Sequence, residues 1–305
     1  EFHSFKPSLQ VRFEEIEAKR SELETYTKGP TRTKQGLELS VYVNVNNQAD
    51  IQRALELDVQ GVGLFRTEFL YFDRADLPSE NEQFEVYKEL LTKFSEKPVT
   101  IRTFDIGGDK PHAKMQMHKE ENPFLGIRGV RLYRENQEIF KTQIRALVRA
   151  SEFGTLRVMI PMVTCISEWS WVVQVVNEVL VSQKASKKFP RGMMVEVPAA
   201  AMALDDFAPT CEFFSIGSND LFQYTMAIDR SNSELDSISD PLNTGFQRLL
   251  QSIVDQSVRL GRPVSICGEL AGDSRFYRNL VELQPLVPSV SPSRVPRLRR
   301  ELAEI

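Results

Sequence analysis

The stretch GVGLFRTE, residues 61–68, predicts how this chain folds. Its first five residues are apolar or glycine, as in a strand buried on both faces, and an arginine and a glutamate follow where that strand ends. Barrel enzymes assemble their sites at the C-terminal ends of parallel strands. The stretch therefore indicates one strand of an α/β barrel that delivers charged side chains to a site.

The same pattern recurs along the chain. Short apolar or β-branched runs alternate with longer helical patterns, which favours βαβ units and a parallel sheet. Helices are expected at Ala49–Leu57, Ser79–Phe94, Gln137–Glu152, Ile166–Gln183 and Asn243–Leu260. We expect a (β/α)8 TIM barrel of the α/β class with these strands: Ser40–Asn46, Gly61–Glu68, Val99–Gly107, Leu156–Val163, Gly192–Pro198, Glu212–Asn219, Pro263–Glu269 and Leu286–Ser291.

The two ends of the chain depart from this pattern. Pro285, Pro288 and Pro292 crowd the eighth strand, and it is the weakest assignment because each proline removes a backbone donor. Residues 7–27 have the spacing of an amphipathic helix. We expect residues 1–36 to form an N-terminal helix and linker and residues 37–305 to form the barrel.

Composition excludes several classes of function. The 305 residues are 41% hydrophobic and 26% charged, with a formal net charge of −4, which argues against binding to nucleic acid. No apolar run is long enough to cross a membrane and the polar start is not a signal peptide, so a cytoplasmic protein is expected. Cys165, Cys211 and Cys267 have no CxxC spacing, and for Cys165 and Cys211 the simplest interpretation is a small buried hydrophobe.

Arginines at strand ends indicate an anionic ligand. Arg66 and Arg102 lie towards the C-terminal ends of predicted strands, and Arg230 lies in the loop that follows another. Guanidinium groups match phosphate and carboxylate oxygens in pairs. Pairing with surface carboxylates would explain any one of them, but explains all three less well. Arg128 and Arg131 lie in a loop before a helix, where binding and structural roles are equally good interpretations.

Two acids at neighbouring strand ends indicate a cation. Glu196 and Asp220 are placed as expected for carboxylates that share Mg²⁺ with substrate oxygens and water. The alternative is that both acids are neutralised by the same arginines. Asn219 can donate to a phosphate or cap the next helix.

Cys267 also ends a strand, where a thiol can move a proton to or from carbon. The alternative is an inert strand cysteine. His3, His112 and His118 fall in no strand-end motif, so no Ser-His-Asp or Cys-His arrangement is expected.

Six sequence motifs, which contain the residues discussed above, resemble in the same order those of enzyme I of the bacterial phosphoenolpyruvate-dependent sugar phosphotransferase system. The resemblance runs from about residue 40 to residue 273. The motifs are GVGLFRTEFLYFDR (61–74), RTFDIGGDKP (102–111), ENPFLGIRGVRL (121–132), VEVPAAA (195–201), FFSIGSNDLFQYTMAIDR (213–230) and SICGELAGD (265–273).

The resemblance implies a cytoplasmic phosphotransferase whose barrel binds phosphoenolpyruvate and Mg²⁺. A histidine on a separate N-terminal domain takes the phosphate and passes it to a histidine-containing phosphocarrier protein, and the barrel forms a homodimer. No histidine of this chain suits that role, so we expect the chain by itself to bind phosphoenolpyruvate without completing transfer. The implied roles are phosphate binding for Arg66, Arg102, Asn219 and Arg230, further substrate binding for Arg128 and Asp220, Mg²⁺ binding for Glu196 and Asp220, and protonation of the enolpyruvate carbon by Cys267.

Alternatives stay open within and beyond this family. VEVPAAA and SICGE are closer to the nitrogen-related paralogue of enzyme I than to the sugar-uptake form. Pyruvate phosphate dikinase and phosphoenolpyruvate synthase have similar barrels, although RTFDIGGDK favours enzyme I. A catalytically idle module that senses phosphoenolpyruvate is a third hypothesis. Residues 276–292 depart from the family, which has an apolar helix and a glycine pair there.

Overall fold

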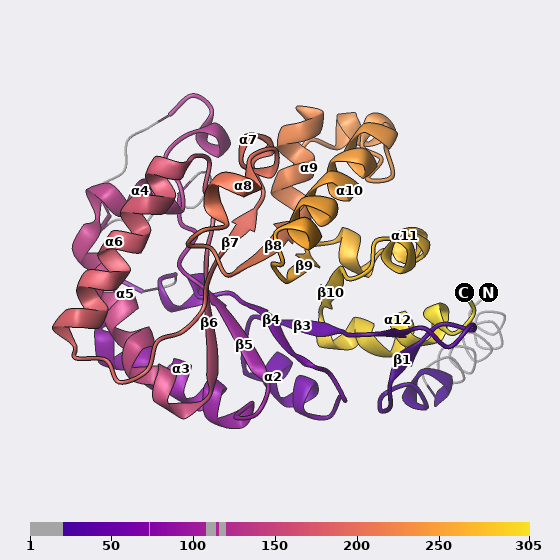
Figure 1. Ribbon diagram of the computed structural model, residues 1–305, viewed down its shortest axis with the longest axis horizontal. Helices are drawn as coiled ribbons and strands as arrows, with labels where there is room; N and C mark the ends of the chain where they lie inside the picture. The colour runs from indigo at the N-terminus through magenta and orange to yellow at the C-terminus, as the bar shows by residue number, and fades with distance from the viewer. Residues whose placement is uncertain (1–20, 73, 108–113, 116–119) are drawn as a thin grey trace, which may run out of the picture.

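The computed structural model describes residues 21–72, 74–107, 114–115 and 120–305. Eight parallel strands close into a barrel in the order β10-β3-β4-β5-β6-β7-β8-β9 (Figure 1). The predicted (β/α)8 barrel is therefore confirmed. The strands are β3 (Tyr42–Val45), β4 (Gly61–Phe65), β5 (Pro98–Arg102), β6 (Thr155–Ile160), β7 (Arg191–Val195), β8 (Phe213–Gly217), β9 (Val264–Cys267) and β10 (Val287–Val290).

Helices surround the barrel and cover the outer faces of the strands. In Figure 1, α3, α5 and α6 lie along one side and α9, α10 and α11 along another. The five long helices predicted from the sequence are all present, with bounds within two residues of those expected. The helices are α2 (Gln48–Leu55), α3 (Glu80–Lys93), α4 (Val130–Glu135), α5 (Gln137–Ala150), α6 (Ile166–Ser182), α7 (Pro198–Ala201), α8 (Leu204–Phe207), α9 (Ser218–Met226), α10 (Thr244–Arg259), α11 (Tyr277–Glu282) and α12 (Val295–Leu302).

Two apolar clusters hold the elements together. A large cluster fills the layer between strands and helices, and its biggest fully buried side chain is Trp169. A small second cluster consists of Leu64, Met159, Met194, Phe213 and Cys267, all from barrel strands. Three members of the small cluster, Leu64, Met194 and Cys267, lie at or next to the C-terminal ends of their strands.

The proline-rich eighth strand does form and closes the barrel. Ser289 and Val290 pair with β3, whereas Val287 and Pro288 pair with β9. Of the three prolines in this region, only Pro288 lies within β10, so the strand keeps the backbone donors of its other three residues.

The N-terminal part of the chain lies against the end of the barrel. Strands β1 (Thr31–Arg32) and β2 (Glu38–Leu39) form a small antiparallel sheet beside α12 (Figure 1). Of the helix predicted at 7–27, residues 21–24 are helical, whereas residues 25–27 form a turn, so the helix ends earlier than expected. Residues 7–20, like His3, His112 and His118, lie outside the described residues.

One prediction for the cysteines is wrong. Cys211 is buried as expected, but Cys165 is exposed. Cys165 precedes the first turn of α6, where its thiol is 3.1 Å from the hydroxyl of Ser167. The first backbone N–H groups of a helix have no partner within the helix and face water or polar side chains. The side chain of Cys165, at this position, therefore lies outside the core.

Candidate active site

A cavity of about 440 Å³ opens at the C-terminal ends of the barrel strands. The residues that follow β3, β4, β5, β7, β8 and β9 form its walls. Every site residue predicted from the sequence lines this cavity: Arg66, Arg102, Arg128, Glu196, Asn219, Asp220, Arg230 and Cys267.

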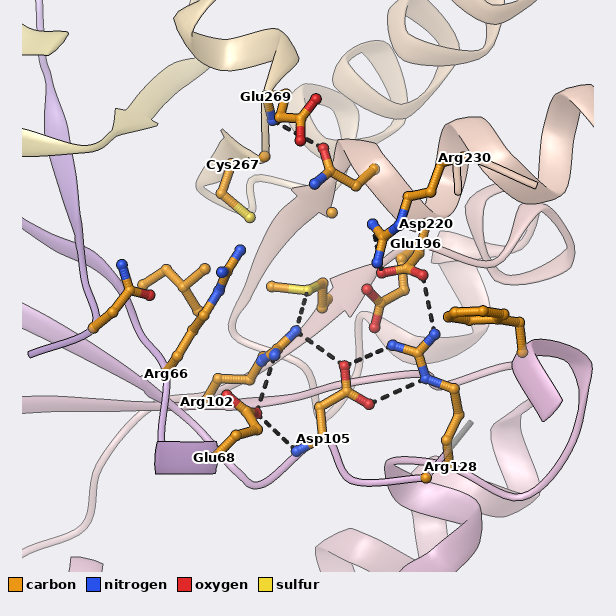
Figure 2. A pocket seen from close by; sticks show the side chains of 18 of the residues that line it. Arg66, Glu68, Arg102, Asp105, Arg128, Glu196, Asp220, Arg230, Cys267 and Glu269 are labelled. Carbon is orange, nitrogen blue, oxygen red and sulfur yellow. Dashed lines mark hydrogen bonds and ion pairs between the residues drawn. The ribbon is translucent and has the colours of Figure 1, made fainter. Parts of the chain in front are cut away.

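Two of the four arginines are buried and firmly held. Arg102 Nη2 donates to Glu68 Oε1 at 3.0 Å, and its Nη1 lies 3.2 Å from Asp105 Oδ2. Arg128 donates two hydrogen bonds to Asp105, at 2.8 and 3.3 Å, and a third to Asp220, at 3.0 Å (Figure 2). Burial lowers the pKa of each guanidinium, but the nearby carboxylates outweigh burial and raise both values overall. Both side chains therefore stay charged in fixed positions.

Glu68 and Asp105 also line the cavity and are not among the site residues predicted from the sequence. Asp105 lies between the two buried arginines in Figure 2, and its side chain is only 4% exposed. Burial raises the pKa of Asp105, but the charges of Arg102 and Arg128 outweigh burial and lower it overall. The available signal is the i,i+3 spacing of Arg102 and Asp105, since buried guanidinium groups require carboxylate partners. Glu68 pairs with Arg102 across 34 positions, which no local spacing indicates.

The other two arginines are exposed and loosely held. Arg230 is 42% exposed, and its closest carboxylate oxygen, Asp220 Oδ2, is 3.9 Å away. Arg66 has no hydrogen bond or ion pair within the part of the chain that the structure describes. The cavity thus combines two fixed guanidinium groups with two whose donors are available to a ligand.

The two predicted metal-binding acids lie side by side in the cavity (Figure 2). Glu196 is fully buried; its Oε1 accepts from the backbone N–H of Met162 at 2.6 Å, whereas its Oε2 has no partner. Burial raises the pKa of Glu196 to about 8, and the charges of Asp220 and Asp105 add to this effect. A Cβ on Gly217 would come within 2.8 Å of the unpaired Oε2, so glycine leaves the space beside that oxygen open.

Cys267 ends β9 in an apolar setting. Its thiol contacts the carbonyl of Ile216 at 3.5 Å and belongs to the small barrel cluster. Burial raises the pKa of Cys267 to about 11, although Arg66 and Arg102 act to lower it. The group is therefore a protonated thiol at neutral pH, a form that can donate a proton.

Asn219 lies in the first turn of α9 and does not cap that helix, because the cap residue is Gly217. Its Oδ1 accepts from the backbone N–H of Glu269 at 2.9 Å. This bond fixes the amide so that its nitrogen remains as a donor, at the N-terminus of a helix where anions are favoured.

Arg131 takes no part in the cavity. It donates to the carbonyls of Leu125 and Gly126, at 3.0 and 2.9 Å, and to Thr164 Oγ1 at 2.8 Å. Of the two interpretations left open for Arg131, the structural one agrees with these contacts. Its neighbour Arg128 points into the cavity instead.

The fold is a closed parallel α/β barrel, and its cavity at the strand ends is lined by arginines and carboxylates. These features are those of the class of α/β-barrel proteins that bind small anions at the strand ends. The chain belongs to the family of PEP-utilising enzymes: residues 20–305 match the PEP-binding domain of that family. The PEP of that description is phosphoenolpyruvate.

Curated relatives agree with this assignment. The chain is 42% identical over 276 residues to the phosphoenolpyruvate-protein phosphotransferase of Geobacillus stearothermophilus, covering 88% of this chain and 48% of the relative. It is 42% identical over 261 residues to the protein of the same name from Bacillus subtilis (strain 168), covering 84% and 46%. Multiphosphoryl transfer protein 1 of Escherichia coli (strain K12) is 40% identical over 272 residues, covering 88% and 33%.

The chain thus spans about half the length of the phosphotransferases that it matches. Among solved structures, a malate synthase from Haloferax volcanii aligns with a TM-score of 0.53 at 14% identity, covering 90% of this chain and 74% of that one. A citrate lyase from Burkholderia xenovorans aligns with a TM-score of 0.51 at 15% identity, covering 87% and 77%. These likenesses concern the barrel fold alone. None of the helices in the described residues is long and apolar enough to cross a membrane.

Proposed function

We propose that this chain is the phosphoenolpyruvate- and Mg²⁺-binding domain of a phosphoenolpyruvate-protein phosphotransferase. The observation that carries the proposal is the convergence of four arginines and two neighbouring carboxylates on one cavity at the strand ends (Figure 2). Phosphoryl transfer depends mainly on position and charge, which such an arrangement supplies. The names of the curated relatives support the same reaction.

In this proposal the loosely held cations bind the phosphoryl group. Arg66 and Arg230 have donors to spare, and the Asn219 amide is fixed by its bond to Glu269. Arg102 and Arg128 contribute charge from fixed positions deeper in the cavity and bind the substrate from there. Flexible donors can follow a phosphoryl group as its bond to the enol oxygen breaks, whereas fixed donors orient the part that stays.

The donor set fits Mg²⁺. Among the described residues, no group of three or more His, Cys, Asp and Glu side chains is placed to hold a metal ion. Glu196 Oε2 is buried without a partner, and Mg²⁺ takes one or two carboxylates and completes its shell with phosphate oxygens and water. Glu196 and Asp220 would hold the ion, which would neutralise charge on the substrate oxygens when bound.

Cys267 is the proposed acid. When the bond between phosphorus and the enol oxygen breaks, the electron pair stays on that oxygen and gives the enolate of pyruvate. The terminal carbon of the enolate takes the proton of the Cys267 thiol, and pyruvate leaves. The raised pKa of Cys267, about 11 because of its burial, keeps the proton available for this step.

The acceptor in the proposed reaction is a histidine of an N-terminal domain, which then phosphorylates a histidine-containing phosphocarrier protein. By itself this chain binds phosphoenolpyruvate and does not complete the transfer. We also propose a cytoplasmic homodimer, a role in sugar transport or its nitrogen-related counterpart, and a boundary near residue 36 between the linker and the barrel. These points rest on the family resemblance.

Calorimetric titration of the chain with phosphoenolpyruvate tests the proposal. Affinity with Mg²⁺ should exceed affinity without it by about tenfold or more, equivalent to ~1.4 kcal/mol. Arg230→Ala should weaken binding by about 100-fold, because a phosphoryl oxygen loses a charged donor. The control Arg259→Ala removes an exposed arginine of α10 that pairs with Asp205, and it should change nothing. An affinity indifferent to both Mg²⁺ and Arg230→Ala would refute the proposal.

A further inference from the structure

The carboxylate proposed to bind the metal is already engaged by arginines. Asp220 Oδ1 accepts from Arg128 Nη1 at 3.0 Å, and Asp220 Oδ2 faces Arg230 at 3.9 Å. The Arg128 and Asp220 side chains are only 8% and 10% exposed, so water screens their attraction weakly. Figure 2 shows the Arg128 guanidinium reaching across to Asp220 from one side of the cavity, with Arg230 on the other.

Arg128 has a second anchor that does not depend on Asp220. Its Nη2 and Nε donate to the two oxygens of Asp105, at 2.8 and 3.3 Å. Its backbone is held as well, because Arg128 forms an isolated bridge with Gly107. A Cβ on Gly107 would lie 2.6 Å from the Cβ of Arg128, so the two segments are in close contact. Arg128 can therefore release Asp220 and keep both its charge partner and its position.

A divalent cation and this guanidinium compete for the same acid. Two positive groups that share one carboxylate in a buried site repel each other, and the repulsion is strong where the local dielectric constant is low. We propose that Arg128 holds Asp220 while the metal is absent, and that binding of the cation releases the Arg128 Nη1 group for the substrate. This inference rests on the proposed function, since it assumes that Glu196 and Asp220 bind Mg²⁺.

The exchange gives Arg128 two opposite effects. It weakens metal binding to the empty site, because the metal must displace it from Asp220. It strengthens substrate binding to the metal-loaded site, because the freed donor then faces a substrate oxygen. Since linkage is reciprocal, metal and phosphoenolpyruvate each raise the affinity for the other through this residue.

Metal binding without substrate tests the inference. The probe is Mn²⁺ in place of Mg²⁺, titrated into the chain in the absence of phosphoenolpyruvate and followed by electron paramagnetic resonance. Arg128→Gln should bind Mn²⁺ about tenfold more tightly than the parent, which corresponds to the loss of one charge-assisted hydrogen bond that competes with the metal. The same variant should bind phosphoenolpyruvate in the presence of Mn²⁺ about tenfold more weakly.

The control is Arg259→Gln, which removes one positive charge from the exposed face of α10 and should leave Mn²⁺ affinity unchanged. If Arg128→Gln does not fold, Arg128→Lys replaces it: a lysine is a point charge that cannot grip Asp105 and Asp220 together, so Mn²⁺ affinity should still rise by a few-fold. An Mn²⁺ affinity that is unchanged or weaker in the folded Arg128 variant overturns the inference.

The two proposals fail in different ways. If the parent binds phosphoenolpyruvate with Mn²⁺ and the Arg128 variant shows no tighter Mn²⁺ binding, only this inference is wrong. If the parent binds neither Mn²⁺ nor phosphoenolpyruvate, the proposed function is wrong and this inference falls with it.

Discussion

The four arginines of the cavity differ in what holds them, and this difference organises the site at the level of single residues. Arg102 and Arg128 are buried beside Asp105, which keeps them charged and in place. Arg66 and Arg230 stand at the open side with little to restrain them. A buried guanidinium costs several kcal/mol in desolvation unless a carboxylate compensates it. Only the exposed pair is therefore available without breaking an existing ion pair.

At the same scale, the three cysteines should differ in reactivity. The pKa of Cys267 is raised to about 11 by burial, so about one thiol in ten thousand is ionised at pH 7. Iodoacetamide should therefore modify exposed Cys165 first at pH 7, and the modification of Cys267 should accelerate as pH rises towards 11. Peptide mapping by mass spectrometry measures both rates. Buried Cys211, whose pKa burial raises to about 12, is the internal control. Equal rates for Cys165 and Cys267 at pH 7 would contradict the buried thiol.

At the scale of elements, most predicted strands extended too far at their C-terminal ends. The second was expected at Gly61–Glu68 but ends at Phe65, and the third was expected at Val99–Gly107 but ends at Arg102. The chain leaves the sheet at these points because the charged residues turn towards the cavity and the turns that aim them cannot keep the ladder. The overshoots of β4 and β5 thus lie at the ends that place Arg66 and Arg102 in the site.

The loop after β9 offers a test at this scale. Gly268 has φ +93°, and a Cβ there would lie 2.3 Å from Ser218 Oγ and 2.7 Å from Asn219 Oδ1. Gly268→Ala should therefore push the start of α9 away from the loop and weaken phosphoenolpyruvate binding by about tenfold, with a loss of stability of about 2 kcal/mol.

The matched control is Gly261→Ala. Gly261 has φ +63° with no atom within 4 Å of a built Cβ, so this substitution introduces backbone strain alone. It should cost about 1 kcal/mol and leave phosphoenolpyruvate affinity intact. Calorimetry and thermal unfolding measure the two effects. Identical behaviour of the two variants would mean that the close contact at Gly268 has no role in the site.

At the scale of the whole molecule, barrel closure brings together residues that are remote in sequence. Arg128 and Asp220 are 92 positions apart, and Arg299 contacts Thr31 across 268 positions. Arg299 is 3% exposed and donates to the carbonyls of Tyr26, Thr27 and Asp58, at 3.1, 2.6 and 2.6 Å. One side chain of α12 thus fastens the N-terminal segment to the end of the barrel opposite the cavity.

Removal of this fastening should lower stability without touching the site. Arg299→Gln should reduce the free energy of unfolding by about 2 kcal/mol, because three part-buried carbonyls lose a charged donor. Phosphoenolpyruvate affinity should stay the same. Arg297→Gln is the control: its 50% exposed side chain pairs with Glu301, and the change should cost less than about 0.5 kcal/mol. Thermal unfolding compares them, and equal melting temperatures would show that Arg299 contributes nothing special.

The sequence by itself determined the barrel and eight of the residues that line its cavity. Each strand is a local apolar run, and a parallel barrel brings all C-terminal strand ends to one face, so position along the chain implies position at the site. Tertiary structure alone decided the pairings: Asp105 between two arginines, Arg128 on Asp220, Arg299 on the N-terminal segment, and closure through a strand that contains proline. These pairings depend on distances between segments remote in sequence, which no local pattern encodes. They also depend on burial, because two charges attract each other more strongly where the local dielectric constant is low.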